Sequence, residues 1–98
     1  MTRYVLTRRA EQELGIIYDN TYIKFGIYQA EAYHAGFERI FSLLAQFPRM
    51  GVSTDELAIG LRRFQFQSHY VFYSEAADHI LIRALIHIGA DIRPALFR

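Results

Sequence analysis

Residues 61–88 decide the fold of this chain, because they hold three apolar runs: LRRFQF (61–66), HYVFY (69–73) and HILIRALIHI (79–88). β-Branched and aromatic residues dominate each run, which is the composition of β-strands. The polar breaks QS (67–68) and SEAAD (74–78) are short enough to be tight turns. The stretch therefore predicts a three-stranded antiparallel meander.

The two faces of these strands follow from the alternation of side chains along each run. In the first run, Phe64 and Phe66 share one face. Alternation in the third run puts Ile80, Ile82, Ala84 and Ile86 on one face and Leu81, Arg83, Leu85 and His87 on the other. The second of these faces mixes apolar and charged groups, so we expect either the C-terminal segment of the chain or another protein to cover it.

Length and composition limit the classes of protein to consider. Ninety-eight residues suit one domain, residues 1–98, with a modest core. The net charge of +1 and the even spread of charge give no basic stripe for direct nucleic-acid binding. Cysteine is absent, which excludes disulfides and thiolate metal sites and suits a reducing cytoplasm. The apolar runs are too short to span a membrane, and no motif requires a metal or another cofactor.

The N-terminal half predicts a short strand and two helices. Arg3–Leu6 is a strand candidate, and Thr7 is a natural N-cap because its hydroxyl can accept a hydrogen bond from the first helical turn. The first helix ends at Gly26, and the second runs from about Tyr28 to Phe47. The buried sides predicted for the two helices are Ala10, Leu14, Ile17, Tyr18, Thr21 and Phe25, and Ala30, Tyr33, Phe37, Ile40, Phe41, Leu44 and Phe47. Residues 49–60 predict a loop.

The order of elements is therefore β-α-α-β-β-β followed by a C-terminal tail. Two amphipathic helices with a very short connection form an antiparallel hairpin, which needs an apolar surface to cover. The predicted fold class is α+β: an N-terminal strand and an antiparallel helix hairpin packed on one face of an antiparallel β-sheet. We expect the first strand to run antiparallel to the meander strand that it joins, and the pattern does not choose between the two edges.

A second apolar stripe lies on the back of the first helix. Ile16, Ile23 and Ile27 recur at helical spacing, and Tyr22 lies beside them. The solvated back of a helix normally carries Glu, Lys or Gln, so this row indicates a surface for a partner. We expect the open face of the third run to contribute to it. The predicted partner-binding set is Ile16, Tyr22, Ile23, Ile27, Leu81 and Leu85.

The C-terminal end of the chain is the second candidate site. His87 and Asp91 are four residues apart and could form a hydrogen-bonded pair, a general base or a binding site. The tail mixes charged, proline and aromatic residues, which suits a transient, polar-rimmed contact. We therefore predict a target-binding site at His87, Asp91 and Arg93. The competing interpretation is that Leu96 and Phe97 cover Leu81 and Leu85, which would make the tail structural.

No other group of residues forms a recognisable catalytic motif. The histidines show no metal-binding spacing, and the chain has no glycine-rich phosphate loop. Arg62, Arg63 and Arg83 could face a phosphate together, or each could form an ion pair with Asp78 or Glu75. The residues by themselves thus predict a fold and a partner surface, and they predict no enzyme.

Several short motifs, taken in order, resemble those of one group of bacterial proteins. Residues 6–14 (LTRRAEQEL) are similar to a strand followed by an Ala-Glu-x-x-Leu helix turn, and residues 47–51 (FPRMG) to an x-Pro-x-x-Gly segment after the second helix. Residues 60–64 (GLRRF) and 69–73 (HYVFY) are similar to parts of the meander. Residues 82–91 (IRALIHIGAD) resemble the ending Ile-Arg-x-Leu-x-His-x-x-x-Asp. The chain thus resembles the RelE/ParE superfamily of bacterial type II toxins, and its ParE branch in particular.

The resemblance implies the toxin of a type II toxin–antitoxin system, neutralised by a ParD-like antitoxin and directed at DNA gyrase without enzymatic activity. The RelE branch implies an alternative, a ribosome-dependent endoribonuclease that would use Arg63, Arg83 and His87. The middle-strand position that carries an arginine in RelE-type nucleases is Tyr70, which favours the first interpretation. An arginine that ParE toxins often have after the histidine is absent, and Gly89 stands near its place. A degenerate toxin that only binds its antitoxin is a third interpretation.

Overall fold

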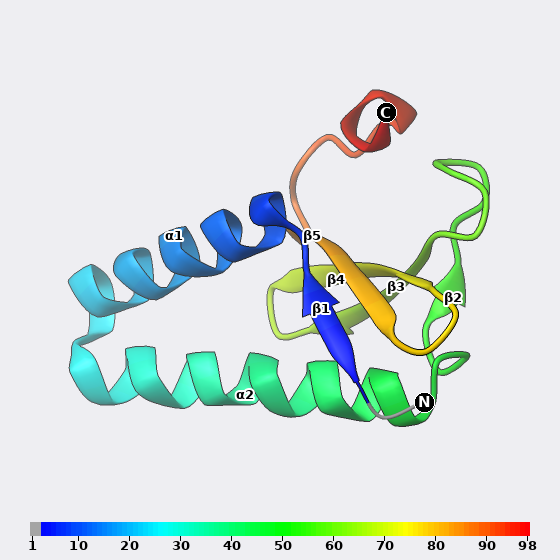
Figure 1. Ribbon diagram of the computed structural model, residues 1–98. Helices are drawn as coiled ribbons and strands as arrows, with labels where there is room; N and C mark the ends of the chain where they lie inside the picture. The colour runs from blue at the N-terminus through cyan, green and yellow to red at the C-terminus, as the bar shows by residue number, and fades with distance from the viewer. Residues whose placement is uncertain (1–2) are drawn as a thin grey trace.

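The computed structural model describes residues 3–98 (Figure 1). Its elements are β1 (Tyr4–Leu6), α1 (Arg8–Phe25), α2 (Ile27–Gln46), β2 (Val52–Ser53), β3 (Arg62–Phe66), β4 (His69–Glu75), β5 (Ile80–His87) and the short 3-10 helix η1 (Pro94–Phe97). The predicted helices and meander are confirmed. The short elements β2 and η1 lie in segments predicted to be a loop and a tail, because such short elements give no periodic pattern.

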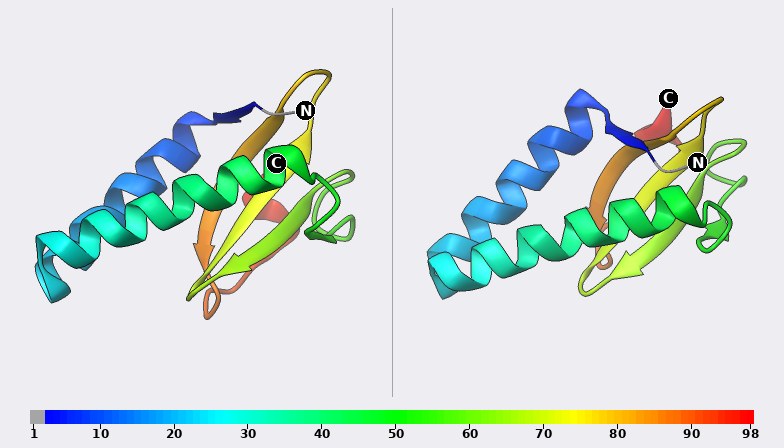
Figure 2. Two further views of the ribbon diagram at one scale, coloured as in Figure 1. Left: turned by 90° about the horizontal axis from the view of Figure 1, so that it is seen from below. Right: turned by 60° about the horizontal axis from the view of Figure 1, so that its bottom comes forward.

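The sheet has the strand order β1-β5-β4-β3-β2, and the helix hairpin covers one of its faces (Figures 1 and 2). The α+β class is confirmed, and β3, β4 and β5 pair antiparallel as predicted. The predicted direction of β1 is wrong, because β1 pairs parallel with β5. The second helix runs past β1, with the ring centroids of Phe41 and Tyr4 5.4 Å apart. It therefore returns the chain to the end of the sheet where β1 begins (Figure 1).

Local interactions at both ends define α1. The Thr7 hydroxyl accepts a hydrogen bond from the Ala10 N–H (3.1 Å) and donates one to the Arg83 carbonyl (3.1 Å). The N-cap thus also joins the helix to β5. At the other end, Gly26 has a φ of +88°, in the left-handed region that favours glycine. The chain can therefore turn sharply between the two helices.

A β-bulge at Arg83 changes which residues of β5 face the helices. Phe72 of β4 lies opposite Ala84, whereas Tyr73 lies opposite Ile82, so Arg83 is an extra residue in β5. The predicted division of this strand is therefore wrong. Ile80, Ile82 and Leu85 face the helices. Leu81, Ala84 and Ile86 face the outer side, which is the face of the sheet away from the helices.

The core has two parts, one on each face of the sheet. The buried residues of the helix-side cluster are Ala10, Ile17, Phe37, Phe41, Leu44, Ala45, Val71, Tyr73, Ile80, Ile82 and Leu85. The outer cluster consists of Leu61, Phe72, Ala84, Ile86 and Phe97. Phe97 of η1 is 9% exposed, and its ring centroid lies 4.8 Å from that of Phe72. Of the two covers considered for the second face, the C-terminal segment is the one that the structure shows, although the tail packs on this cluster rather than on Leu81 and Leu85.

The helix hairpin extends beyond the sheet (Figure 2). Phe25 and Phe47, both predicted to be buried, are 71% and 58% exposed. Phe25 lies at the tip of the hairpin, and Phe47 lies at the C-cap of α2. Helical periodicity places a side chain on one face of a helix, but it does not show how far the sheet extends beneath that face.

Tyr73 joins the sheet to the loop after α2. Its buried hydroxyl accepts a hydrogen bond from the Gly51 N–H (2.9 Å) and donates one to the Pro48 carbonyl (2.7 Å). A Cβ at Gly51 would lie 2.5 Å from this hydroxyl oxygen, so a larger residue would push the two apart. The hydroxyl therefore fixes the loop that leads into β2.

We predict that Tyr73→Phe lowers the free energy of unfolding by about 1–3 kcal/mol, because the buried Gly51 N–H then has no acceptor. Urea unfolding measures this difference. Tyr70→Phe is the matched control on the outer face, with an expected change below about 0.5 kcal/mol. Equal stability of Tyr73→Phe and the wild-type chain would contradict the role given to this hydroxyl.

Candidate functional site

The tip of the helix hairpin carries exposed apolar side chains. Ile16 and Ile23 are two helical turns apart and project from the same side of α1. Ile27 belongs to the first turn of α2 rather than to a continuous row. Ile23, Phe25 and Tyr28 are 78%, 71% and 90% exposed. We define the hairpin surface as Ile16, Tyr22, Ile23, Phe25, Ile27 and Tyr28.

The structure separates the predicted partner-binding residues into two groups. Those on the hairpin, Ile16, Tyr22, Ile23 and Ile27, are all exposed. Leu81 and Leu85 do not form an open face with each other, because the bulge turns Leu85 toward the helices, where it is 3% exposed. Leu81 faces the outer side, opposite Val5 of β1. Sequence reasoning missed Phe25, which it placed in the core, and Tyr28, for which helical spacing gave no signal.

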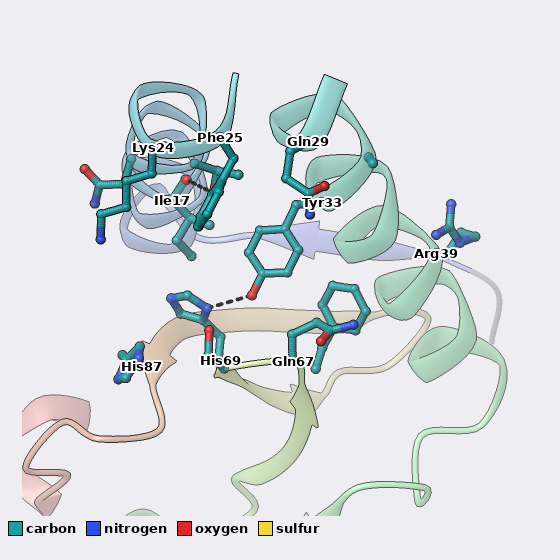
Figure 3. A pocket seen from close by; sticks show the side chains of 14 residues that line it. Ile17, Lys24, Phe25, Gln29, Tyr33, Arg39, Gln67, His69 and His87 are labelled. Carbon is teal, nitrogen blue, oxygen red and sulfur yellow. Dashed lines mark hydrogen bonds between the residues drawn. The ribbon is translucent and has the colours of Figure 1, made fainter. Parts of the chain in front are cut away.

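A groove of about 700 Å³ lies between the hairpin and the β3–β4 turn (Figure 3). Both helices, the turn and the ends of β4 and β5 line it. Its apolar lining includes Ile17, Phe25 and Phe66. Among its described lining residues, the fixed charges are those of Lys24 and Arg39, with no acidic side chain. The groove therefore suits a segment that carries both apolar and carboxylate groups.

Two histidines line this groove at the ends of neighbouring strands. His69 and His87 lie opposite each other in β4 and β5, with their ring centroids 5.5 Å apart. The Tyr33 hydroxyl and His69 Nδ1 form a hydrogen bond of 2.9 Å (Figure 3). Burial lowers the pKa of His69 below its ordinary value, and the nearby His87 lowers it further. His69 therefore remains neutral to a lower pH than a free histidine does.

The residues predicted to face the target lie along the chain from the end of β5 into the tail. His87 Nδ1 accepts a hydrogen bond from the Gly89 N–H (2.9 Å), and the Asp91 carboxylate pairs with the Arg93 guanidinium at 2.8 Å. The hydrogen-bonded pair of His87 and Asp91, one of the three possibilities considered, is therefore not formed. All three predicted residues are exposed. His87 faces the groove, whereas Asp91 and Arg93 lie in the segment before η1.

The arginines considered for phosphate binding have separate contacts. Arg62 donates hydrogen bonds to two carbonyls of the loop before β2. The Arg63 guanidinium lies over an aromatic ring of β4, and Arg83 donates a hydrogen bond of 3.5 Å to a carbonyl of the tail. Of the two carboxylates considered as their partners, Asp78 and Glu75, Asp78 pairs with Arg3 instead, at 3.3 Å. These arginines do not form one cationic group.

Three further properties of the described chain bear on the site. Within residues 3–98, no group of three or more His, Cys, Asp or Glu side chains is placed so that it could hold a metal ion. Neither helix of this part of the chain has both the length and the apolar character to cross a membrane. Each buried polar side-chain atom that the structure describes has a hydrogen-bond partner.

The fold is shared with a solved structure from a toxin–antitoxin system. A chain titled "Chromosomal ParDE TA system from P. aeruginosa" matches with a TM-score of 0.78, over 91% of this chain and 98% of that one. Its sequence is 19% identical, so the likeness shows the fold alone. The chain therefore has the same small α+β fold as that chain of the ParDE system.

Sequence comparisons define the family. The model of the family described as "ParE toxin of type II toxin-antitoxin system, parDE" matches residues 4–91. Toxin ParE1 of Mycobacterium tuberculosis (strain ATCC 25618 / H37Rv) is 36% identical over 92 residues, which cover 93% of this chain and 94% of that protein. Toxin ParE of Escherichia coli is 32% identical over 97 residues, which cover 98% and 94%. The chain belongs to the ParE toxin family of type II toxin–antitoxin systems, which confirms the resemblance.

We predict that His69 makes stability depend on pH. Because its pKa is lower in the folded chain, the unfolded chain binds protons more readily. The contribution of His69 to the free energy of unfolding is complete above the ordinary histidine pKa of about 6.5. This contribution is lost as the pH falls below that value. His69→Gln does not titrate, so urea unfolding should show a flatter profile between about pH 7 and pH 5. Parallel profiles for the two proteins would refute the lowered pKa.

Proposed function

We propose that this chain is a toxin that stops growth by inhibiting DNA gyrase, and that a ParD-like antitoxin neutralises it by covering the hairpin surface. Membership of the ParE toxin family supports the toxin role. The observation that carries the proposal is the hairpin tip, where Ile23 and Tyr28 lie largely in solvent. Toxin and antitoxin then form a hetero-oligomer.

The hairpin surface suits a helix or an extended segment laid across it. Burial of an aliphatic or aromatic side chain such as Ile16, Ile23 or Phe25 by a partner would contribute about 1.5–3 kcal/mol to the free energy of binding. Because the hairpin extends past the sheet, one partner can reach both its tip and the groove beside it (Figures 2 and 3). The basic Lys24 and Arg39 in the groove attract a partner segment with acidic residues.

The geometry favours a non-enzymatic toxin over a ribosome-dependent endoribonuclease of the RelE type. Such a nuclease would use Arg63, Arg83 and His87 together. Arg63 lies opposite Phe72 and faces the outer side, whereas His87 lies opposite His69 and faces the helices. Groups on opposite faces of a sheet do not converge on one phosphate, as general acid–base catalysis requires.

We place the gyrase-binding site at the tail, with His87 at its edge. The side chains of Asp91 and Arg93 are 74% and 73% exposed and pair with each other. An exposed pair of this kind contributes only about 0–1 kcal/mol to stability, so its structural role is small. Exposed polar residues on a segment that packs at its end suit a polar contact with a large partner.

We predict that Ile23→Glu weakens antitoxin binding by at least about 1–2 kcal/mol, the scale of a buried interface side chain that loses its pocket. Titration calorimetry with a ParD-like antitoxin measures the affinity. Ser42→Glu adds the same charge at an exposed position near the C-terminal end of α2, away from the hairpin tip, and should leave binding unchanged. If Ile16→Glu and Ile23→Glu remain folded and bind as wild type does, the antitoxin uses another surface.

A supercoiling assay with purified gyrase tests the target. We expect the wild-type chain to inhibit supercoiling and the antitoxin to restore it. The double variant Asp91→Ala/Arg93→Ala should inhibit about tenfold less, with its stability changed by less than about 0.5 kcal/mol. Glu56→Ala, in the exposed loop before β3, is the control and should inhibit as wild type does.

Two outcomes would contradict the proposed target. Ribosome-dependent cleavage of RNA that His87→Ala abolishes, with gyrase unaffected, would support the RelE-type alternative. A folded chain that binds antitoxin but neither inhibits gyrase nor arrests growth would be a degenerate toxin.

A further inference from the structure

Arg9 of α1 holds the C-terminal tail against the body of the protein. Its guanidinium lies over the Phe97 ring, 5.6 Å from the centroid, and donates a hydrogen bond to the Leu96 carbonyl. A cation over an aromatic face and a hydrogen bond from a charged donor both stabilise such a contact. Both contacts fall on η1, the last element of the chain.

Glu13, one helical turn further along α1, sets the position of Arg9. Its Oε1 accepts a hydrogen bond of 3.0 Å from the Leu85 N–H, beside the bulge, and lies 3.5 Å from Arg9 Nε. On the strand side, Arg83 donates to the Phe97 carbonyl. The tail is therefore held by groups from both α1 and β5.

These contacts fix the far end of the segment that carries Asp91 and Arg93. The near end is fixed by the strands, since the Ile88 N–H donates to the Ser68 carbonyl at 2.9 Å. Between these anchors, the side chains of Asp91 and Arg93 are exposed, while Ile92 packs against the outer cluster. Without the far anchor, only the strand end and the packing of Ile92 would hold the segment.

We propose that Arg9 is a positioning residue for target binding: it keeps η1 docked and so presents Asp91 and Arg93 in one conformation. This inference rests on the proposed role of the tail in target binding. Arginine suits the position because its planar guanidinium can stack on a ring and donate several hydrogen bonds at once. The compact ammonium of lysine cannot stack in this way. A segment ordered before binding loses less conformational entropy on binding.

The test compares Arg9→Gln, Arg9→Lys and the control Arg8→Gln, which removes a charge from the exposed neighbouring position. In Arg9→Gln, the Leu96 amide, which donates to the Arg93 carbonyl, should exchange its hydrogen about tenfold faster. Growth arrest and gyrase inhibition should each weaken about tenfold, while antitoxin affinity stays within about threefold. Arg9→Lys should fall between Arg9→Gln and wild type, and Arg8→Gln should match wild type.

The inference is overturned if Arg9→Gln arrests growth as wild type does, or if it loses activity without faster exchange in the tail. If Arg9→Gln does not fold, Arg9→Lys decides: it must show faster tail exchange and weaker growth arrest than Arg8→Gln. Growth arrest does not depend on which target is bound. A wild-type chain that arrests growth without inhibiting gyrase therefore disproves the proposed target and leaves the test of Arg9 intact.

Discussion

The β-bulge at Arg83 is the constraint on which the rest of the structure depends. It turns Leu85 toward the helices, on the same side as Ile82, and turns Ala84 toward the outer cluster that the tail covers. A bulge takes backbone groups out of the ladder, and such groups need other partners. The first helix supplies them: the Thr7 hydroxyl donates to the Arg83 carbonyl, and the Glu13 carboxylate accepts from the N–H of Leu85. Hairpin, sheet and tail are thus joined at one place.

The two proposed binding surfaces both depend on α1. The hairpin surface runs from the middle of α1 to the first turn of α2, and the hairpin extends beyond the sheet (Figure 2). The tail contacts its first turn through Arg9, which pairs with Glu13. Arg9, Glu13, Ile16 and Ile23 recur at spacings of three, four and seven, and so lie on one side of α1. The hairpin tip and the tail contact therefore lie toward opposite ends of one side of α1.

Sequence patterns predicted the features that depend on neighbouring residues, such as the sides of the helices. They failed for features that depend on contacts with distant segments. Helical spacing found Ile16 and Ile23, since a helix fixes which side a residue projects from. The third run alternates without a break, so nothing within it signals the bulge, which the sequence reasoning missed together with the burial of Leu85. The direction of β1 depends on how far α2 runs past it. His69 was not predicted to line a groove, because its partner Tyr33 comes from a helix 36 residues earlier.

Amide hydrogen exchange of the wild-type chain, alone and with a ParD-like antitoxin, tests most directly the claim that the hairpin tip is the covered surface. The first turn of α2 has no side-chain cap, and its exposed side chains give it little packing, so it should open readily in the free chain. We expect the antitoxin to slow exchange most from Ile16 to Tyr28, with little change in β3 and β4. Protection confined to the sheet, with the hairpin tip unchanged, would contradict it.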